Sequence, residues 1–124
     1  MKRAPLRGEI WFLQLPTDPP EKGRRPAIVV SMDIRNRHDR ADTVLVVPLT
    51  TSIHTVAHTH VLLSAGETGL QLDSVARAEN ITTVRKQSLF EPRGSLRRLS
   101  NARVCELAAK VMIAMDCATS REQG

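Results

Sequence analysis

An arginine and three hydroxyl side chains stand at the ends of two apolar segments, where they could act together on an anionic group. The arginine opens segment 25–31, and the hydroxyls end segment 44–52. A guanidinium carries a permanent positive charge, and hydroxyls both donate and accept hydrogen bonds. Because Pro26 fixes its own φ at about −65° and biases the preceding residue toward an extended backbone, the sequence predicts a defined position for the guanidinium. The side chains concerned are Arg25, Thr50, Thr51 and Ser52.

Short apolar segments rich in β-branched residues predict the strands that would position these groups. Segment 16–24 contains three prolines and one glycine, so we expect an exposed, partly mobile loop before the second strand. The polar segment 32–40 predicts a turn or a short helix. The expected strands span 7–15, 25–31, 43–50, 59–64 and 70–79, with a glycine-containing hairpin connection at 65–69 between the last two.

One helix is expected near the C-terminus, with Ser100 as its N-cap. Apolar residues recur there three and four positions apart, which predicts a single stripe that packs on the sheet. Short strands followed by one closing helix predict a mostly β fold, a small barrel of mostly antiparallel strands, because few short strands can hide their edges only by curling. The stripe consists of Val104, Leu107, Ala108, Val111, Met112 and Met115.

Length and charge limit the classes of protein to consider. The 124 residues suffice for one core and not for two, so we expect a single domain over residues 1–124. Residues 1–40 hold nine basic and five acidic side chains, which predicts a basic face that attracts nucleic acid or an acidic partner. The aromatic side chains are Trp11, Phe12 and Phe90 alone, a composition that disfavours single-strand binders that stack bases on many rings.

Cysteine and histidine usage gives little sign of a metal or a disulfide. Cys105 and Cys117 fall in the expected helix about 18 Å apart, so we expect free thiols, which fits a reducing cytoplasm. No segment is long and apolar enough to cross a membrane, and we expect no membrane partner. His54, His58 and His60 lack a cysteine or carboxylate at ligand spacing, so exposed histidines are expected rather than a metal site.

Four motifs occur in an order and at spacings that resemble the MazF/PemK/Kid family of toxins, over about residues 7–115. The resemblance implies an SH3-like barrel that works as a homodimer and cleaves single-stranded RNA sequence-selectively, with no metal or other cofactor. It also implies a cognate antitoxin, and the basic end of segment 16–24 would suit an acidic, extended antitoxin segment as well as phosphate. The motifs are Arg7-Gly8-Glu9-Ile10-Trp11, Gly23-Arg24-Arg25-Pro26-Ala27-Ile28-Val29-Val30-Ser31, Val46-Val47-Pro48-Leu49-Thr50-Thr51-Ser52 and Asp73-Ser74-Val75.

RNA cleavage by attack of a 2′-hydroxyl on its own phosphate needs a proton acceptor, a donor for the leaving 5′-oxygen and positive charge for the developing dianion. The resemblance places Arg25 and Thr50 at the family's catalytic arginine and threonine. Arg25 would stabilise that charge or protonate the leaving group, and Thr50 would hold a phosphate oxygen. Alternation along the fifth strand would put Arg77 and Glu79 on one face. One branch of the family uses such a pair as acid and base, so Glu79 is the candidate general base.

Departures from the family pattern leave the RNA preference open. Segment 16–24 has no histidine and no Glu-Gln pair, and Ile81-Thr82-Thr83 stands where an arginine is common. Two alternatives also remain: a non-enzymatic inhibitor of DNA gyrase resembling the CcdB toxins, and an inactive RNA-binding barrel. A gyrase inhibitor would not need the four catalytic candidates. The further residues expected to bind RNA are Glu9, Gly23, Arg24, Thr51, Ser52 and Asn80.

Overall fold

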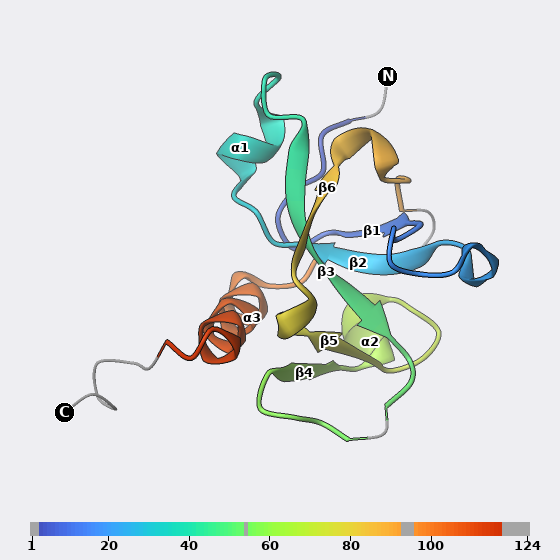
Figure 1. Cartoon of the computed structure of the whole chain (residues 1–124), viewed down its shortest axis with the longest axis vertical. Helices are drawn as coiled ribbons and strands as arrows, with labels where there is room; N and C mark the ends of the chain where they lie inside the picture. The colour runs from blue at the N-terminus through green and yellow to red at the C-terminus, as the bar shows by residue number, and fades with distance from the viewer. Residues whose placement is uncertain (1–2, 54, 93–95, 118–124) are drawn as a thin grey trace.

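Over the residues that the structure describes, the strands form one six-stranded sheet in which every pairing is antiparallel. The computed structural model of the chain describes residues 3–53, 55–92 and 96–117, and Figure 1 shows their arrangement. The strand order is β1-β2-β3-β5-β4, with β6 paired to β3 beside this path. The bounds are β1 Ile10–Leu13, β2 Arg25–Val29, β3 Thr43–Thr50, β4 His60–Leu63, β5 Ser74–Arg77 and β6 Thr82–Arg85.

The long strand β3 joins the two halves of the sheet. Its first four residues, Thr43–Val46, pair with β6, and its last two, Leu49 and Thr50, pair with β5. On the edge of β3 that faces away from β2, the partner changes at Val47 and Pro48. Pro48 has no N–H to donate to a ladder hydrogen bond. Figure 1 shows β3 running from β6 to β5 across the molecule. Among the described residues β1 and β4 do not pair with each other, so the sheet curves without closing.

The predicted mostly β fold with a C-terminal helix is confirmed, although the barrel stays open. Each face of the sheet carries its own apolar cluster, because neighbouring residues of β3 point to opposite sides. Val47 and Leu49 belong to the cluster beneath the C-terminal helix, and Val44 and Val46 belong to the other. The second cluster is built around Trp11, Leu13, Leu15, Ala27, Val29, Val84 and Leu89.

The C-terminal helix α3, Asn101–Ala114, begins as the sequence predicts. The Ser100 Oγ accepts a hydrogen bond from the Arg103 N–H at 3.3 Å. The first half of the stripe is buried against β4 and the turn after β5, through Val104 and Leu107. The stripe prediction is wrong at its far end, where Met115 is 67% exposed. Figure 1 shows the last turn of α3 pointing away from the sheet. The apolar side chains at that end therefore have no sheet surface to pack against.

Three predicted features of the β region differ from the structure. The strand predicted at 70–79 is limited to Ser74–Arg77. The hairpin connection contains a helical turn, α2 Ala65–Thr68, because the Ser64 Oγ caps its start and Gly69, at φ 82°, ends it. The sequence reasoning also missed β6, since Val84 is the one buried side chain among its four residues and gives no alternating apolar pattern.

The remaining predictions concern the short helix, the thiols and membrane segments. The expected turn or short helix in 32–40 is confirmed as α1, Asp33–Arg37. Cys105 lies in α3, whereas Cys117 lies beyond its end, and both are exposed, free cysteines. Within the described part of the chain, no helix has the length and apolar character needed to span a bilayer.

Candidate active site

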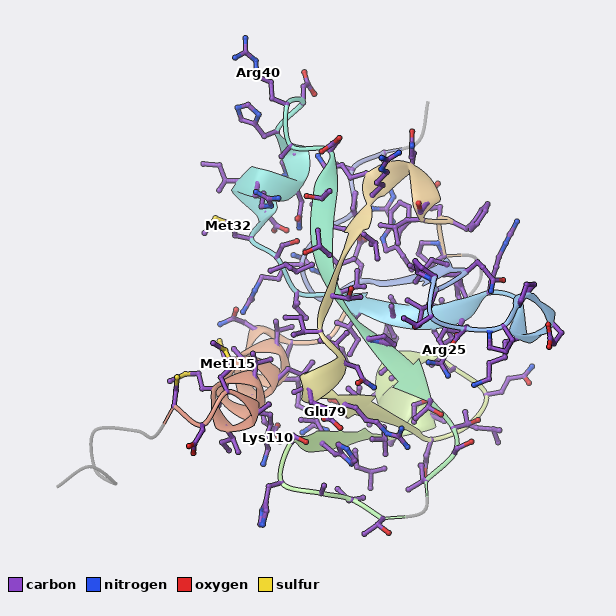
Figure 2. The ribbon with its side chains drawn as sticks, in the orientation of Figure 1. Arg25, Met32, Arg40, Glu79, Lys110 and Met115 are labelled. Carbon is purple, nitrogen blue, oxygen red and sulfur yellow. The ribbon has the colours of Figure 1, made fainter. Side chains whose placement is uncertain are left out.

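The start of β2 and the end of β3 meet at a hollow of about 620 Å³, which Arg25 and Thr50 both line. Ala27 pairs with Pro48 in the register of these two strands. Arg25 and Thr50 each lie two residues beyond this pair, and the two-residue alternation puts both on the same face of the sheet. The structure therefore brings the cation and the hydroxyl together on adjacent, rigid strands. Figure 2 shows Arg25 at this end of β2, close to the end of β3.

Further donors surround the same hollow. Thr51 and Ser52 line it, as does Lys22 from the loop before β2. The Ser52 N–H donates a hydrogen bond to the Thr50 Oγ1 at 3.1 Å. Because that oxygen accepts here, the Thr50 hydroxyl keeps its own hydrogen to donate elsewhere. An anion in the hollow would meet a guanidinium, an ammonium and hydroxyl donors beside apolar walls, which strengthen such contacts.

The structure adds an acidic residue that the sequence reasoning did not single out. The Asp18 Oδ2 lies 3.3 Å from the Arg25 Nε. The loop that carries it contains a short 3-10 helix, η1 Pro20–Lys22, and a turn closed by the Asp18 N–H and the Leu15 carbonyl oxygen at 3.1 Å. The sequence shows only that Asp18 lies in a proline-rich loop seven residues before Arg25. The contact between them depends on the path of that loop, which the sequence does not specify.

The prediction that Arg77 and Glu79 share one face of a strand is wrong. β5 ends at Arg77, and Glu79 lies in the 3-10 helix η2, Ala78–Asn80. The chain turns here because Ala78 is buried in the cluster beneath α3 and its N–H donates to the Thr59 carbonyl oxygen at 2.9 Å. Figure 2 shows Glu79 beside α3, apart from Arg25. The pair Arg25 and Thr50 and the carboxylate of Glu79 therefore form two separate groups rather than one.

Arg77 lies on the sheet between these two groups. Arg77 pairs with His60 of the neighbouring strand β4. Val75, two residues before Arg77, pairs with Thr50 of β3 on the other side. Alternation therefore places Arg77 on the face that carries Thr50. The Arg77 Nε is buried and has no hydrogen-bond partner within the described residues. A cation in this position could contact an anion that extends from the hollow toward β4.

Glu79 is held by two side chains that precede it in the sequence by about twenty residues. Its Oε1 accepts from the Thr59 hydroxyl at 2.7 Å, and its Oε2 lies 3.1 Å from the His60 Nε2. The Ala57 N–H donates to the His60 Nδ1 at 3.1 Å. Because the Nδ1 accepts this hydrogen bond, the Nε2 carries the hydrogen that is donated to Glu79.

These contacts shift the acidity of Glu79. Partial burial alone would raise the pKa of the Glu79 carboxyl, but the hydrogen bonds from Thr59, from its own backbone and from His60 outweigh burial and hold the pKa below its usual value. The carboxylate is therefore ionised at neutral pH and able to accept a proton. It is also a weaker base than an ordinary glutamate, so its usefulness depends on position more than on basicity.

The other residues expected to bind RNA take several positions. Glu9 accepts hydrogen bonds from Leu6 N at 2.7 Å, Arg3 at 2.9 Å and Trp11 Nε1 at 3.1 Å. Partial burial would raise the pKa of Glu9, and these bonds outweigh it and lower the pKa. Arg24 lies outside the hollow, with its guanidinium carbon 3.3 Å from the centre of the Phe90 ring. Gly23 precedes β2 at φ 66°, and Asn80 is an exposed residue of η2.

No metal site was expected from the histidine pattern. His54 lies outside the described residues. Of the other two, His58 is exposed and His60 is bound to Glu79. Within the part of the chain that the structure describes, no three His, Cys, Asp or Glu side chains gather in a way that could hold a metal ion.

Comparisons with known proteins identify the family. The model of the PemK-like, MazF-like toxins of type II toxin-antitoxin systems matches residues 6–115. Endoribonuclease MazF9 of Mycobacterium tuberculosis is 39% identical over 118 residues, which cover 89% of this chain and 95% of the relative. Endoribonuclease EndoA of Bacillus subtilis is 37% identical over 88 residues, which cover 68% of this chain and 74% of the relative.

A solved structure agrees with these relatives. A mycobacterial endoribonuclease in complex with its cognate antitoxin superimposes with a TM-score of 0.70 at 26% identity, covering 94% of this chain and 99% of the other. The family model spans most of this chain, and MazF9 matches it over nearly its whole length. The chain belongs to the PemK-like, MazF-like toxin family.

Proposed function

We propose that this chain is an endoribonuclease that cleaves single-stranded RNA sequence-selectively and without a metal ion, as the toxin of a type II toxin-antitoxin system. The observation that carries the proposal is the position of Arg25 and Thr50, side by side on adjacent strands at one hollow. The names of the relatives MazF9 and EndoA support an endoribonuclease. They do not favour the alternatives of a gyrase inhibitor or an inactive RNA-binding barrel.

The chemistry we propose is attack by the 2′-hydroxyl on the adjacent phosphate. The 2′-O–P bond forms and the P–O5′ bond breaks, so one proton leaves the 2′-hydroxyl and one reaches the 5′-oxygen. Arg25 stabilises the dianion or protonates the leaving group, and the Thr50 hydroxyl donates to a phosphate oxygen. Glu79 accepts the 2′-hydroxyl proton. Because the 2′-oxygen attacks the phosphate on the neighbouring 3′-oxygen, Glu79 can act as the base only within hydrogen-bond reach of the same nucleotide whose phosphate Arg25 and Thr50 hold.

The proposal includes the partners and the cellular location. A cognate antitoxin would place an acidic, extended segment against Lys22 and Arg24, beside the hollow, and so compete with RNA for the same basic surface. The functional unit is a homodimer located in the cytoplasm. Each of its subunits is one toxin domain over residues 1–124. The antitoxin complex of the mycobacterial endoribonuclease supports an antitoxin as partner.

The test is incubation of the purified protein with a mixed single-stranded RNA in EDTA. We expect cuts at a small set of related sequences, with 5′-hydroxyl ends on the downstream fragments, because the leaving group is the 5′-oxygen. Mapping both ends of each fragment identifies the recognised sequence. Intact RNA in EDTA that is cut after addition of Mg²⁺ would contradict a metal-independent mechanism.

Substitution of Glu79 by glutamine tests its role as the base. Because the pKa of Glu79 is lowered, the wild-type rate should fall only at a pH below the usual range of a glutamate. Glu79→Gln should lower the rate by about 10²-fold or more and abolish this fall at low pH, because an amide does not take up a proton there. Single-turnover rates across the acid range measure both effects. Glu91→Gln, an exposed residue that pairs with Arg3, is the matched control, and an acid limb unchanged in Glu79→Gln would assign the base elsewhere.

A further inference from the structure

Asp18 stands out because it is an almost enclosed carboxylate with little to stabilise it. Its side chain is 11% exposed, against 24% for Arg25. The Asp18 Oδ2 is buried and has no hydrogen-bond partner within the described residues, although the Arg25 Nε lies at ion-pair distance. The contact is therefore a charge pairing without an aligned hydrogen bond. Burial of a carboxylate is costly unless a cation compensates it, so this position depends on Arg25.

The geometry of the contact leaves the useful end of Arg25 available. Asp18 approaches the Nε, at the side-chain end of the guanidinium. Across the described residues, no hydrogen bond or ion pair engages the two terminal nitrogens of Arg25. Those nitrogens form the fork that binds a phosphate in bidentate fashion, and Arg25 lines the hollow. A carboxylate behind the guanidinium thus restrains its direction without occupying the phosphate-binding end.

The loop is constructed to keep Asp18 in place. The Asp18 N–H donates to the Leu15 carbonyl oxygen at 3.1 Å, and Leu15 is buried, 4% exposed, in the cluster around Trp11. The carboxylate is therefore anchored to the core only three residues away. The arginine is fixed from the other side by Pro26 and by the pairing of Leu13 with Arg25 between β1 and β2.

We propose that Asp18 is a positioning residue, which holds the Arg25 guanidinium so that its terminal nitrogens face the phosphate in the hollow. The proposal rests on the proposed RNA cleavage. A misplacement of a catalytic group by about 1 Å can cost about 10²-fold in rate, so removal of Asp18 should act on the chemical step. A loop carboxylate that merely competed with phosphate for Arg25 would have the opposite effect, because its removal would strengthen RNA binding.

The kinetic test compares Asp18→Ala and Asp18→Asn with Asp39→Ala. Asp39 is an exposed aspartate in the loop after α1, so its substitution removes the same charge and corrects for general attraction of RNA. We expect Asp18→Ala to lower the saturating single-turnover rate about 10- to 100-fold with little change in KM relative to Asp39→Ala. Asp18→Asn should lose less, since the amide oxygen still faces the Nε. An unchanged or faster saturating rate in Asp18→Ala, or a KM lower than that of Asp39→Ala, would overturn the proposal.

Two further measurements separate positioning from a general loss of structure. In an Arg25→Ala background, Asp18→Ala should cause no additional loss, and a second loss of the same size would contradict action through Arg25. The Arg25 Nε–H resonance in NMR spectra should shift in Asp18→Ala and Asp18→Asn and stay in place in Asp39→Ala. This readout needs no activity, so a protein that fails to cleave RNA refutes the proposed function, while an unmoved resonance refutes the contact.

Discussion

Arg25→Ala should slow the chemical step of RNA cleavage by about 10²-fold or more, which corresponds to about 2.7 kcal/mol of transition-state stabilisation. Arg25 is the first residue of β2, and it lines the hollow together with Thr50. A cation fixed in this way stabilises charge that develops only as the 2′-oxygen attacks, so its loss lowers the rate at saturating RNA. Single-turnover cleavage with the enzyme in excess measures this rate directly.

The neighbouring arginine provides the matched comparison. Arg24 lies over the Phe90 ring and does not line the hollow. Arg24→Ala removes the same charge one residue away, and we expect it to raise KM while leaving the saturating rate close to that of the wild type. The reverse pattern, in which Arg25→Ala weakens binding but reacts at the normal rate, would make Arg25 an RNA anchor rather than a catalytic residue.

The strands that carry Arg25 and Thr50 could be predicted from sequence because their local signals agree. Both segments are apolar and β-branched, and Pro26 restrains the backbone at the arginine. Their relative position was less accessible, because it depends on the pairing of Ala27 with Pro48 and no residue in either segment specifies that register. The hollow itself also needs Leu70 and Leu72, which come from the connection before β5.

The failures lie where tertiary contacts override a local pattern. Alternation from Val75 to Glu79 looks like an uninterrupted strand, yet the burial of Ala78 turns the chain after Arg77. That turn delivers Glu79 to Thr59 and His60, a contact that the sequence does not indicate. Helical periodicity likewise predicts the start of α3 correctly but says nothing of where the underlying sheet stops.

Asp18 illustrates a third kind of limit. Loop residues have weak local preferences, so the sequence of 16–24 predicts a loop without predicting which side chain folds back. The observed contact needs the turn that closes on Leu15, whose side chain is buried in the core. Chemistry-bearing residues on strands can therefore be assigned from sequence more securely than the loop residues that restrain them.

Replacement of the ribose by deoxyribose at the scissile nucleotide should reduce cleavage at that bond below detection. The nucleophile in the proposed mechanism is the 2′-oxygen of that nucleotide, and no side chain can replace it. The contacts of Arg25 and Thr50 with the phosphate do not involve this hydroxyl, so the modified RNA should still bind. Binding measured by fluorescence anisotropy and cleavage measured on a gel separate the two effects.

The control is an RNA with one deoxyribose placed two nucleotides downstream of the scissile bond, which should be cut at the normal rate because its nucleophile is intact. Comparison of the two substrates distinguishes attack by the 2′-hydroxyl from attack by water. Water would need neither hydroxyl, so cleavage of both substrates at equal rates would assign the reaction to hydrolysis. In that case Glu79 would have to activate a water molecule, and the fragments would end in linear phosphates. With 2′-hydroxyl attack, the upstream fragment from the control RNA ends in a 2′,3′-cyclic phosphate, because the attacking oxygen and the retained oxygen belong to the same ribose.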